Sequence, residues 1–244
     1  MAGCPIQDRG FRFGMHVFET IRVMAGQPAF WARHWELLEQ AAKATGWGGA
    51  PGEMPPPPEL PAVPGVLRLY WTAGDGSPFG EPAAGRLLAA FQPTEVGRKA
   101  PIRAGQCEQP LRGDWAGLKT GQYGERVALL GLIRLAGLDE GLVWFEDGTV
   151  SGWCLANLLV KSQGAWWTPS SERIREGTTL RWVREVASVK AGAIDRTDLL
   201  EAEALGLCNA VQGIIPVVAL DDIEYPADPE LQQWAAAFDR ATRP

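Results

Sequence analysis

Three short stretches of the sequence hold residue types that could bind or convert a small molecule. The first is the run Ala116-Gly-Leu-Lys-Thr-Gly-Gln-Tyr123, in which Lys119 stands between an apolar Gly-Leu pair and a Thr-Gly turn. Partial burial there would lower the pKa of the Lys119 amine and free it for Schiff-base chemistry. On this segment alone, a solvated surface lysine is the ordinary alternative.

The other two stretches could hold an anionic group. Glu176-Gly-Thr-Thr179 stands at an expected helix start, where free backbone N–H groups, two hydroxyls and the positive end of the helix dipole suit a phosphate. Plain helix capping is the commoner role of such a sequence. Cys208-Asn-Ala210 directly follows an apolar strand, and loops in that place often line a pocket.

The composition excludes several classes of partner. The net charge of −6 argues against binding to a nucleic-acid backbone, which needs a cationic surface. No apolar run approaches the ~20 residues that cross a bilayer, and no export signal is evident. We therefore expect a cytoplasmic protein with no nucleic-acid or membrane partner.

The cysteines and histidines do not predict a metal site. No two cysteines have a C-x-x-C spacing, so we expect buried, reduced thiols rather than a disulfide framework. The two histidines, His16 and His34, are too few to hold a metal, and packing is their default role. The cysteines are Cys4, Cys107, Cys154 and Cys208.

The first half of the chain predicts a small unit of strands with one helix. Alternating residues predict a strand over 17–24, Gly26-Gln27 predicts a hairpin turn, and an apolar stripe predicts a helix over 31–45. Residues 51–64 are so rich in proline that we expect an exposed connector there. The remaining expected segments are strands over 66–72 and 86–92 and a linker over 93–101.

The second half mixes strands and helices without strict β-α-β alternation, which predicts an α+β architecture. Asp147-Gly148 is the strongest hairpin signal and predicts a turn between strands over 141–146 and 149–160. Asp228-Pro-Glu230 marks a helix start. The other expected elements are strands over 101–107, 166–168, 204–208 and 214–220 and helices over 121–135 and 178–187.

Short runs spread over most of residues 8–217 form one ordered pattern. They are Asp8-Arg-Gly-Phe-Arg-Phe-Gly14, Val17-Phe-Glu-Thr-Ile-Arg-Val23, Gly117-Leu-Lys-Thr120, Asp139-Glu-Gly-Leu-Val143, Asp147-Gly-Thr-Val-Ser151, Ala156-Asn-Leu158, Gly177-Thr-Thr179, Cys208-Asn-Ala210 and Ile215-Pro-Val217. In this order they resemble the signature of the class IV aminotransferases and their lyase relatives, which are pyridoxal-phosphate enzymes.

The resemblance implies a fold, a cofactor and a site. The fold would be α+β, with a small N-terminal α/β domain over 1–94, a linker and first strand over 95–108, and a larger barrel-like α/β domain over 109–244 that holds the cofactor lysine. Lys119 would carry pyridoxal 5'-phosphate in a pocket between the two domains of a homodimer. The cofactor-binding residues implied are Thr178, Thr179, Asn209, Ala210, Ser151 and Gly152.

Three positions depart from the family pattern. Gly152 stands where the family has a glutamate that keeps the pyridine nitrogen protonated, so the cofactor would be a weaker electron sink. Leu37 stands where the family has an arginine that pairs with the cofactor phosphate, a strong charge-assisted contact. The arginine that usually ends the Gly-Thr-Thr run is Leu180, although Arg181 follows.

Three functions stay open. Ala156-Asn-Leu158 and Cys208-Asn-Ala210 look most like the aminodeoxychorismate lyases of the family, which release pyruvate from 4-amino-4-deoxychorismate to leave 4-aminobenzoate for folate. Aromatisation drives that elimination and relieves the demand on the electron sink. The alternatives are a transaminase for branched-chain or D-amino acids, and a homologue that has lost pyridoxal phosphate and acts as a binding protein or uses different chemistry.

An amino substrate with a carboxylate would also need a cationic partner. Arg12, Arg22 and Arg68 are the candidates, and a solvated surface role is the ordinary alternative for each of them. Lys119 is the expected general base and acid.

Overall fold

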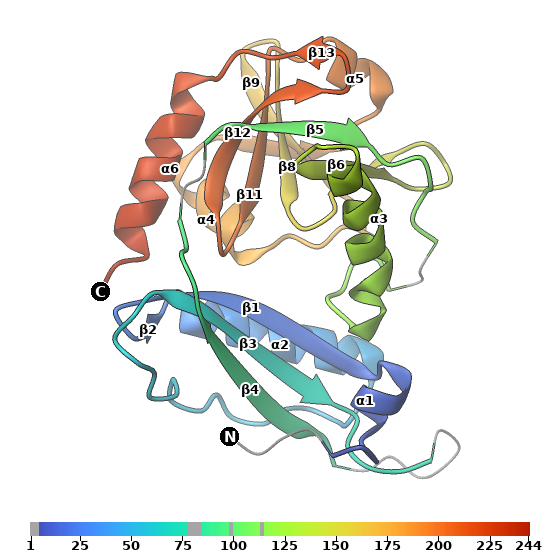
Figure 1. Cartoon of the computed structure of the whole chain (residues 1–244), viewed down its shortest axis with the longest axis vertical. Coiled ribbons are helices and arrows are strands. Elements are labelled where there is room, and N and C mark those ends of the chain that lie inside the picture. Colours follow the sequence, from blue (N-terminus) through green and yellow to red (C-terminus); the bar gives the residue numbers. More distant parts are fainter. Residues whose placement is uncertain (1–4, 78–83, 98–99, 113–114) are drawn as a thin grey trace. The chain divides into compact units, whose positions relative to one another are not determined.

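The computed structural model describes residues 5–77, 84–97, 100–112 and 115–244 (Figure 1). The chain forms two compact units. The first comprises Met1–Val96, Leu118–Tyr123 and Thr242–Pro244, and the second comprises Gly97–Gly117 and Gly124–Ala241. This division differs from the predicted domains at one important place, because the segment that carries Lys119 packs with the first unit and not with the C-terminal one.

The first unit is an antiparallel sheet of order β2-β1-β3-β4 with one long helix packed on it (Figure 1). A short helix precedes β1, and Gly121–Tyr123 forms a single 3-10 turn, η1. The strands are β1 (His16–Met24), β2 (Gln27–Pro28), β3 (Gly65–Thr72) and β4 (Arg86–Pro93), and the helices are α1 (Arg9–Phe13) and α2 (Trp31–Thr45).

Alternation along β1 and β3 gives this sheet two different faces. One face is apolar and packs against α2 through a core of Val17, Ile21, Val23, Leu67, Leu69, Trp71, Trp35 and Leu38. Neighbours in the pairing register, such as Phe18 with Tyr70 and Thr20 with Arg68, project to the opposite face because successive side chains alternate. The sheet therefore buries one side and presents polar and aromatic groups on the other.

Asp8 anchors the start of the first unit. It is fully buried, caps α1 by accepting from the N–H of Gly10 at 2.7 Å, and accepts from the Thr72 hydroxyl at 2.8 Å. Arg86 Nη1 donates to the same carboxylate at 2.7 Å. Asp8 thus joins α1 to the ends of β3 and β4, so the first run of the sequence pattern has a structural role here.

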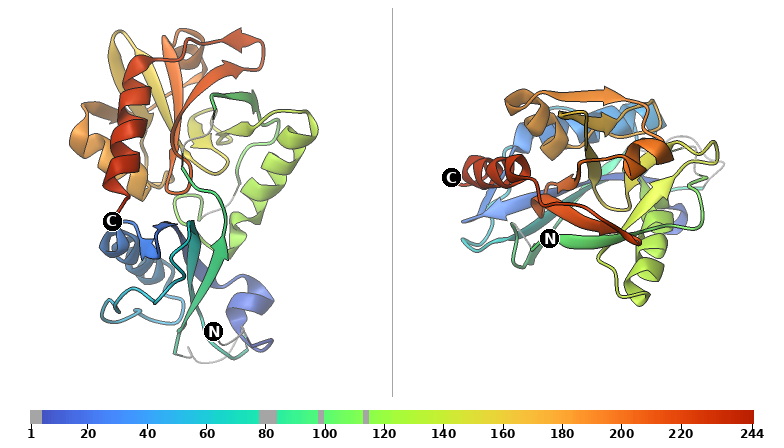
Figure 2. Two further views of the ribbon diagram at one scale, coloured as in Figure 1. Left: turned by 60° about the vertical axis from the view of Figure 1, so that its left-hand side comes forward. Right: turned by 90° about the horizontal axis from the view of Figure 1, so that it is seen from above.

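The second unit is built on a strongly curled nine-stranded sheet of order β10-β9-β8-β11-β12-β5-β6-β7, with β13 paired to β12 (Figure 2). Four helices surround it. The strands are β5 (Ile102–Gln106), β6 (Glu140–Trp144), β7 (Val150–Trp153), β8 (Asn157–Ser162), β9 (Ala165–Pro169), β10 (Val189–Gly192), β11 (Ala204–Asn209), β12 (Gly213–Leu220) and β13 (Ile223–Glu224). The helices are α3 (Gly124–Leu135), α4 (Thr178–Val186), α5 (Arg196–Leu200) and α6 (Pro229–Ala241).

Trp153 occupies the centre of the second unit's core. Its side chain is 1% exposed and packs among apolar residues from the neighbouring strands, including Leu142, Leu158 and Leu205. Its indole N–H donates to the carbonyl oxygen of Gly206 at 3.0 Å, so the only polar atom of this large side chain is satisfied. This arrangement fixes the end of β7 against β11.

The α+β, two-part fold predicted from the sequence is confirmed, and the helix over 31–45 has the predicted bounds. One strand prediction is wrong. Residues 149–160 form two strands instead of one, because a turn closed by Trp153 N–H and the Ala156 carbonyl at 3.2 Å separates β7 from β8. The prediction of buried thiols is confirmed for Cys107, Cys154 and Cys208, while Cys4 lies outside the described residues.

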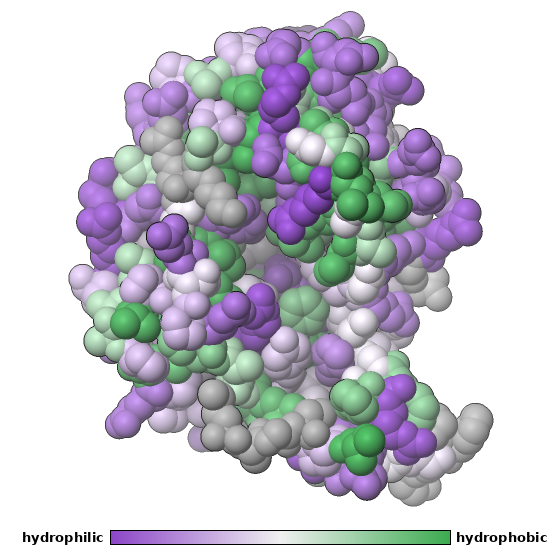
Figure 3. Space-filling view, in the orientation of Figure 1, coloured by the Kyte–Doolittle hydropathy of each residue, from purple (hydrophilic) through white to green (hydrophobic). Residues whose placement is uncertain are grey.

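Apolar side chains reach the surface on the outer side of α3. Val127, Leu132 and Leu135 are exposed there, and Figure 3 shows hydrophobic residues gathered over this helix within a mostly hydrophilic face. No helix within residues 5–77, 84–97, 100–112 and 115–244 combines the length and the apolar character needed to span a membrane.

The close approach of Gly121 to Gly14 predicts the effect of a methyl group. A Cβ at Gly121 would lie 2.2 Å from the Gly14 carbonyl oxygen, whereas a Cβ at Gly131 in α3 would meet nothing within 4 Å. We expect Gly121→Ala to lower the free energy of unfolding by about 1–3 kcal/mol. Gly131→Ala should raise it by about 0.5–1 kcal/mol. Urea denaturation measures both, and equal changes in the two variants would contradict the packing described.

Candidate active site

The segment that carries Lys119 is held against β1. The backbone N–H of Phe18 donates to the carbonyl oxygen of Lys119 at 2.9 Å, and Val17 and Thr120 form an antiparallel bridge. Thr120 is buried, so the segment behaves as a short additional strand of the first unit. This pairing fixes the backbone at Lys119.

Aromatic rings surround the Lys119 amine. Its Nζ lies 4.9 Å from the centroid of the Phe18 ring and 5.5 Å from that of Tyr123. The Phe18 ring meets Tyr123 edge to face and stacks on Tyr70, with centroids 5.3 and 6.0 Å apart. Lys119 is half-buried, so the expected partial burial is confirmed. Ring faces attract an ammonium group and limit its access to water.

The three arginines suggested for a substrate carboxylate have different surroundings. Arg12 is exposed and lies over the ring of Phe13. Arg22 is buried and donates to the Thr242 hydroxyl at 3.1 Å. Arg68 is half-buried, donates to Gln92 at 3.3 Å, and projects from the same sheet face as Phe18. Arg22 and Arg68 therefore both share the sheet face of Phe18, whose ring borders the Lys119 amine, and Arg68 is the less buried of the two.

The other predicted site residues belong to the second unit. Gly177 is the extended N-cap of α4, and the two threonines that follow are buried, with Thr179 1% exposed. Among the residues that the structure describes, Thr179 Oγ1 is a buried atom with no hydrogen-bond partner. Leaving a buried hydroxyl unpaired costs free energy, so this atom is a candidate contact for a polar ligand group.

Asn157 orients the start of α4. Its side-chain oxygen accepts from the N–H of Gly177 at 3.1 Å, and its side-chain nitrogen donates to the Arg175 carbonyl at 2.8 Å. A Cβ at Gly177 would lie 2.8 Å from the same Asn157 oxygen, so a side chain there would displace the Asn157 amide. We did not predict Asn157 as a site residue, although the run Ala156-Asn-Leu158 contained the signal.

Asn209 is the last residue of β11, and Ala210 begins the turn to β12. The side-chain oxygen of Asn209 accepts from the N–H groups of Val211 and Gln212 at 3.1 and 2.8 Å. Its side-chain nitrogen donates to the Gln212 side chain at 3.2 Å. Asn209 therefore stabilises its own turn, and its contact with a phosphate stays a prediction.

Ser151 and Gly152 lie on β7. Both are buried, and Gly152 has a φ of +123°, a conformation that residues with a side chain rarely adopt. The nearest neighbour of a Cβ at Gly152 would be the Ala156 carbonyl oxygen at 3.4 Å. The backbone conformation, rather than lack of space, therefore favours glycine where the family has glutamate.

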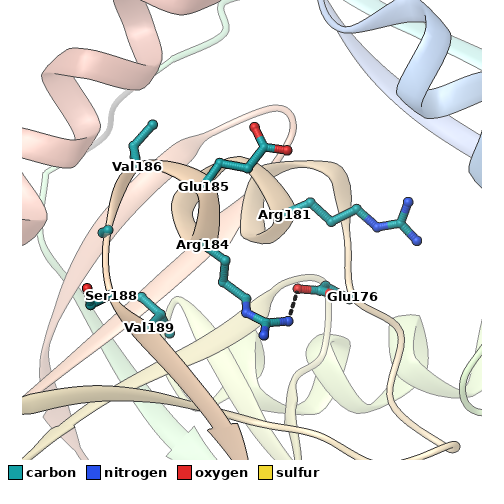
Figure 4. Close-up of a pocket in the computed structure, with 8 residues that line it drawn as sticks. Glu176, Arg181, Arg184, Glu185, Val186, Ser188 and Val189 are labelled. Carbon is teal, nitrogen blue, oxygen red and sulfur yellow. Dashed lines mark hydrogen bonds and ion pairs between the residues drawn. The ribbon is translucent and has the colours of Figure 1, made fainter.

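The other two departures from the family pattern are also buried. Leu37 in α2 and Leu180 in α4 are 5% and 2% exposed. Both are apolar, so neither supplies the positive charge that an arginine would bring to a phosphate. Arg181 is one of the residues that line a groove of about 610 Å³ beside α4 (Figure 4). Across this groove Arg184 pairs with Glu176 at 2.6 Å, and Thr179 does not line it.

The residues present fit a phosphate-bearing cofactor that reacts with an amine. The N-terminal end of α4, the unpaired Thr179 hydroxyl and Gly177 are suited to hold an anionic group in the second unit. Lys119 supplies a half-buried amine in the first unit. No group of three or more His, Cys, Asp or Glu that could hold a metal occurs among the described residues. The fold is that of a two-unit α/β protein, and each unit holds one of the two candidate groups.

The chain belongs to the class IV aminotransferase family. The sequence profile of this family, described as Amino-transferase class IV, matches residues 16–220. Aminodeoxychorismate lyase of Bacillus subtilis (strain 168) is 25% identical over an alignment that covers 89% of this chain and 82% of the relative. The family is pyridoxal-phosphate-dependent.

Solved structures agree with this assignment. The 4-amino-4-deoxychorismate lyase of Pseudomonas aeruginosa superposes with a TM-score of 0.76 and 25% identity, covering 98% of this chain and 96% of its own. A hypothetical aminotransferase of Mycobacterium tuberculosis, in a form with bound pyridoxal phosphate, has a TM-score of 0.81 and 22% identity, with 99% and 94% covered. The second likeness concerns the fold alone.

The unpaired hydroxyl of Thr179 predicts opposite effects on stability and on binding. Thr179→Val removes the hydroxyl at nearly constant volume. Without cofactor, we expect a thermal midpoint that is unchanged or higher, because an unsatisfied buried group is lost. The dissociation constant for pyridoxal phosphate should rise about tenfold, because a hydrogen bond to a charged group is lost.

Thr168→Val is the matched control. The Thr168 hydroxyl is equally buried but donates to the Leu158 carbonyl at 2.9 Å, so its removal should lower stability and leave cofactor affinity unchanged. Calorimetry and fluorescence titration measure the two quantities. A Thr179→Val protein that loses stability and keeps its affinity would assign Thr179 to packing alone.

Glu140, at the start of β6, is a buried carboxyl beside the turn between β7 and β8. Burial raises the pKa of Glu140 to about 7, even though backbone N–H groups of Gly141, Leu155 and Cys154 donate to it. The Gly141 bond is 3.0 Å long. Glu140 therefore ties β6 to that turn, and it fits the folded protein best in its protonated form.

This shift predicts a pH-dependent contribution to stability. The folded pKa lies above the ordinary value of 4.5, so the contribution is complete below pH 4.5 and is lost as pH rises through 7. Glu140→Gln does not titrate. The unfolding free energy of the natural protein, relative to the variant, should fall by about 3 kcal/mol between these pH values. Urea denaturation at a series of pH values tests this, and a constant difference would refute it.

Proposed function

We propose that this chain is a pyridoxal-phosphate-dependent lyase that releases pyruvate from 4-amino-4-deoxychorismate and leaves 4-aminobenzoate. The observation that carries cofactor use is the Lys119 amine, half-buried between the Phe18 and Tyr123 rings on a segment paired with β1. The likeness to the Bacillus subtilis and Pseudomonas aeruginosa lyases supports the choice of reaction.

The candidate site residues have separate roles in the proposed reaction. Lys119 would carry the cofactor and later act as general base and acid for the proton of the substrate. The start of α4, with Thr178 and Thr179, would hold the phosphate. Bound pyridoxal phosphate supplies an electron sink for the substrate carbon. Arg68 would hold the substrate carboxylate, because it projects from the same sheet face as Phe18 and, unlike the buried Arg22, is only half-buried.

The missing carboxylate favours elimination over transamination. Gly152 offers no acid to keep the pyridine nitrogen protonated, so electron withdrawal is weakened. A transaminase depends on that withdrawal twice in each cycle. The lyase depends on it less, because its product gains an aromatic ring. The same reasoning predicts poor amino-group transfer from amino acids to 2-oxo acids.

A spectrum of the purified protein with pyridoxal phosphate tests the proposal. We expect a near-visible band that borohydride traps on Lys119 and that Lys119→Ala abolishes. Lys190→Ala is the matched control, because the Lys190 amine also lies near a ring, 5.0 Å from the centroid of Trp167, but outside the proposed site. This control should keep the band unchanged.

Product analysis then separates the three functions. Release of pyruvate from 4-amino-4-deoxychorismate supports the lyase. Transfer of an amino group from branched-chain or D-amino acids to a 2-oxo acid would replace it with a transaminase. No band at saturating cofactor would mean that the changes at Leu37 and Gly152 abolished cofactor binding, and the proposal would fall.

The proposal includes a cytoplasmic homodimer with no nucleic-acid or membrane partner. The resemblance to the family predicts the dimer, and the net charge of −6 is unfavourable for a phosphate backbone. Sedimentation velocity measures the oligomeric state directly.

A further inference from the structure

Arg126 forms a bridge over Gly152. From α3, its Nη2 donates to the Ser151 hydroxyl oxygen at 2.8 Å, and its Nη1 donates to the Trp153 carbonyl oxygen at 3.1 Å. The guanidinium is therefore bonded to the residue on each side of the position where the family has glutamate. All four residues belong to the second unit.

The bond from Arg126 decides what the Ser151 hydroxyl can do. A guanidinium keeps its protons at any accessible pH and only donates, so Ser151 Oγ must be the acceptor in this pair. The hydroxyl hydrogen is then available to a third group. Within the described part of the chain, Ser151 Oγ makes no hydrogen bond other than the one from Arg126. Ser151 is 5% exposed, so little water reaches its hydroxyl group.

This pair has the opposite preference to a carboxylate. A glutamate at position 152 would accept a hydrogen bond and would favour a protonated pyridine nitrogen. A serine that donates favours a nitrogen with a free lone pair, and a nearby guanidinium repels a second positive charge. Loss of the carboxylate and presence of the Arg126–Ser151 pair therefore both favour an unprotonated pyridine nitrogen.

We propose that Ser151, positioned by Arg126, donates a hydrogen bond to the ring nitrogen of bound pyridoxal phosphate and keeps that nitrogen unprotonated. The inference rests on the proposed function, since it requires the cofactor. Ser151 would be the residue that touches the cofactor, and Arg126 a positioning residue. The result is a cofactor with restrained electron withdrawal, suited to an elimination that aromatisation drives.

Nuclear magnetic resonance of the full chain, with pyridoxal phosphate labelled at the ring nitrogen by the heavy isotope, tests the inference without an activity assay. The nitrogen shift distinguishes a pyridine from a pyridinium. We expect the unprotonated shift in the natural protein and in Ser151→Thr, which keeps the hydroxyl. A protonated shift in the natural protein would overturn the inference while leaving the lyase proposal intact, whereas no bound cofactor signal would overturn both.

Cofactor affinity provides a second readout. The natural protein should bind pyridoxal phosphate about tenfold more tightly than an analogue in which C–H replaces the ring nitrogen, because one hydrogen bond is lost. Ser151→Ala should remove this preference, and Arg126→Gln should reduce it. Arg126→Lys, which retains a permanent donor, should recover part of it. If Arg126→Gln lowers thermal stability but leaves both the preference and the nitrogen shift unchanged, Arg126 has a merely structural role and the inference is wrong.

Discussion

The hydrogen bond from Phe18 N–H to the Lys119 carbonyl is the interaction on which the position of the candidate lysine depends. The chain leaves the second unit after Gly117, pairs with β1, and rejoins the second unit at Gly124. Without that pairing, Lys119 would lie on a flexible connection, and a flexible lysine is a solvated one. The sheet pairing therefore fixes the backbone of this connecting segment and holds the Lys119 amine beside Phe18.

The second unit shows a different constraint. Two of its buried hydroxyl groups have hydrogen-bonding capacity that no described residue uses. Thr179 Oγ1 has no partner among the described residues, and the Ser151 hydroxyl accepts from Arg126 with its own hydrogen still to place. Folded proteins pair nearly all such groups. Two incompletely satisfied hydroxyls on β7 and α4 are therefore more informative about a ligand than the open groove beside Arg181.

Much of the fold could be predicted because long amphipathic patterns decide it. The alternation in β1 indicates a strand and the apolar stripe of α2 indicates a helix, and both elements occur as expected. The five-residue helix α1 is too short to show a period, although the capping box of Asp195 and Asp198 could have revealed α5. The break between β7 and β8 is a turn inside a segment whose local pattern is that of a single strand. The sequence pattern therefore did not predict it.

Some residues of the candidate site could likewise be predicted from the sequence, and others could not. Lys119, Thr178 and Thr179 could be selected from residue type and order, and Asn157 was visible in its motif but was overlooked. Arg126 could not be found in this way, because an arginine in the first turns of a helix has no distinguishing local signal. Its role becomes visible only when α3 packs against β7. Likewise, nothing in the sequence showed that Asn209 uses its side chain within its own turn.

The backbone of Gly152 has a consequence for any attempt to restore an acid at this position. At a φ of +123°, a glutamate would have to adopt a conformation that residues with a side chain rarely hold, so the single substitution would strain β7. Restoring the carboxylate would therefore need a change in the strand as well as in the side chain.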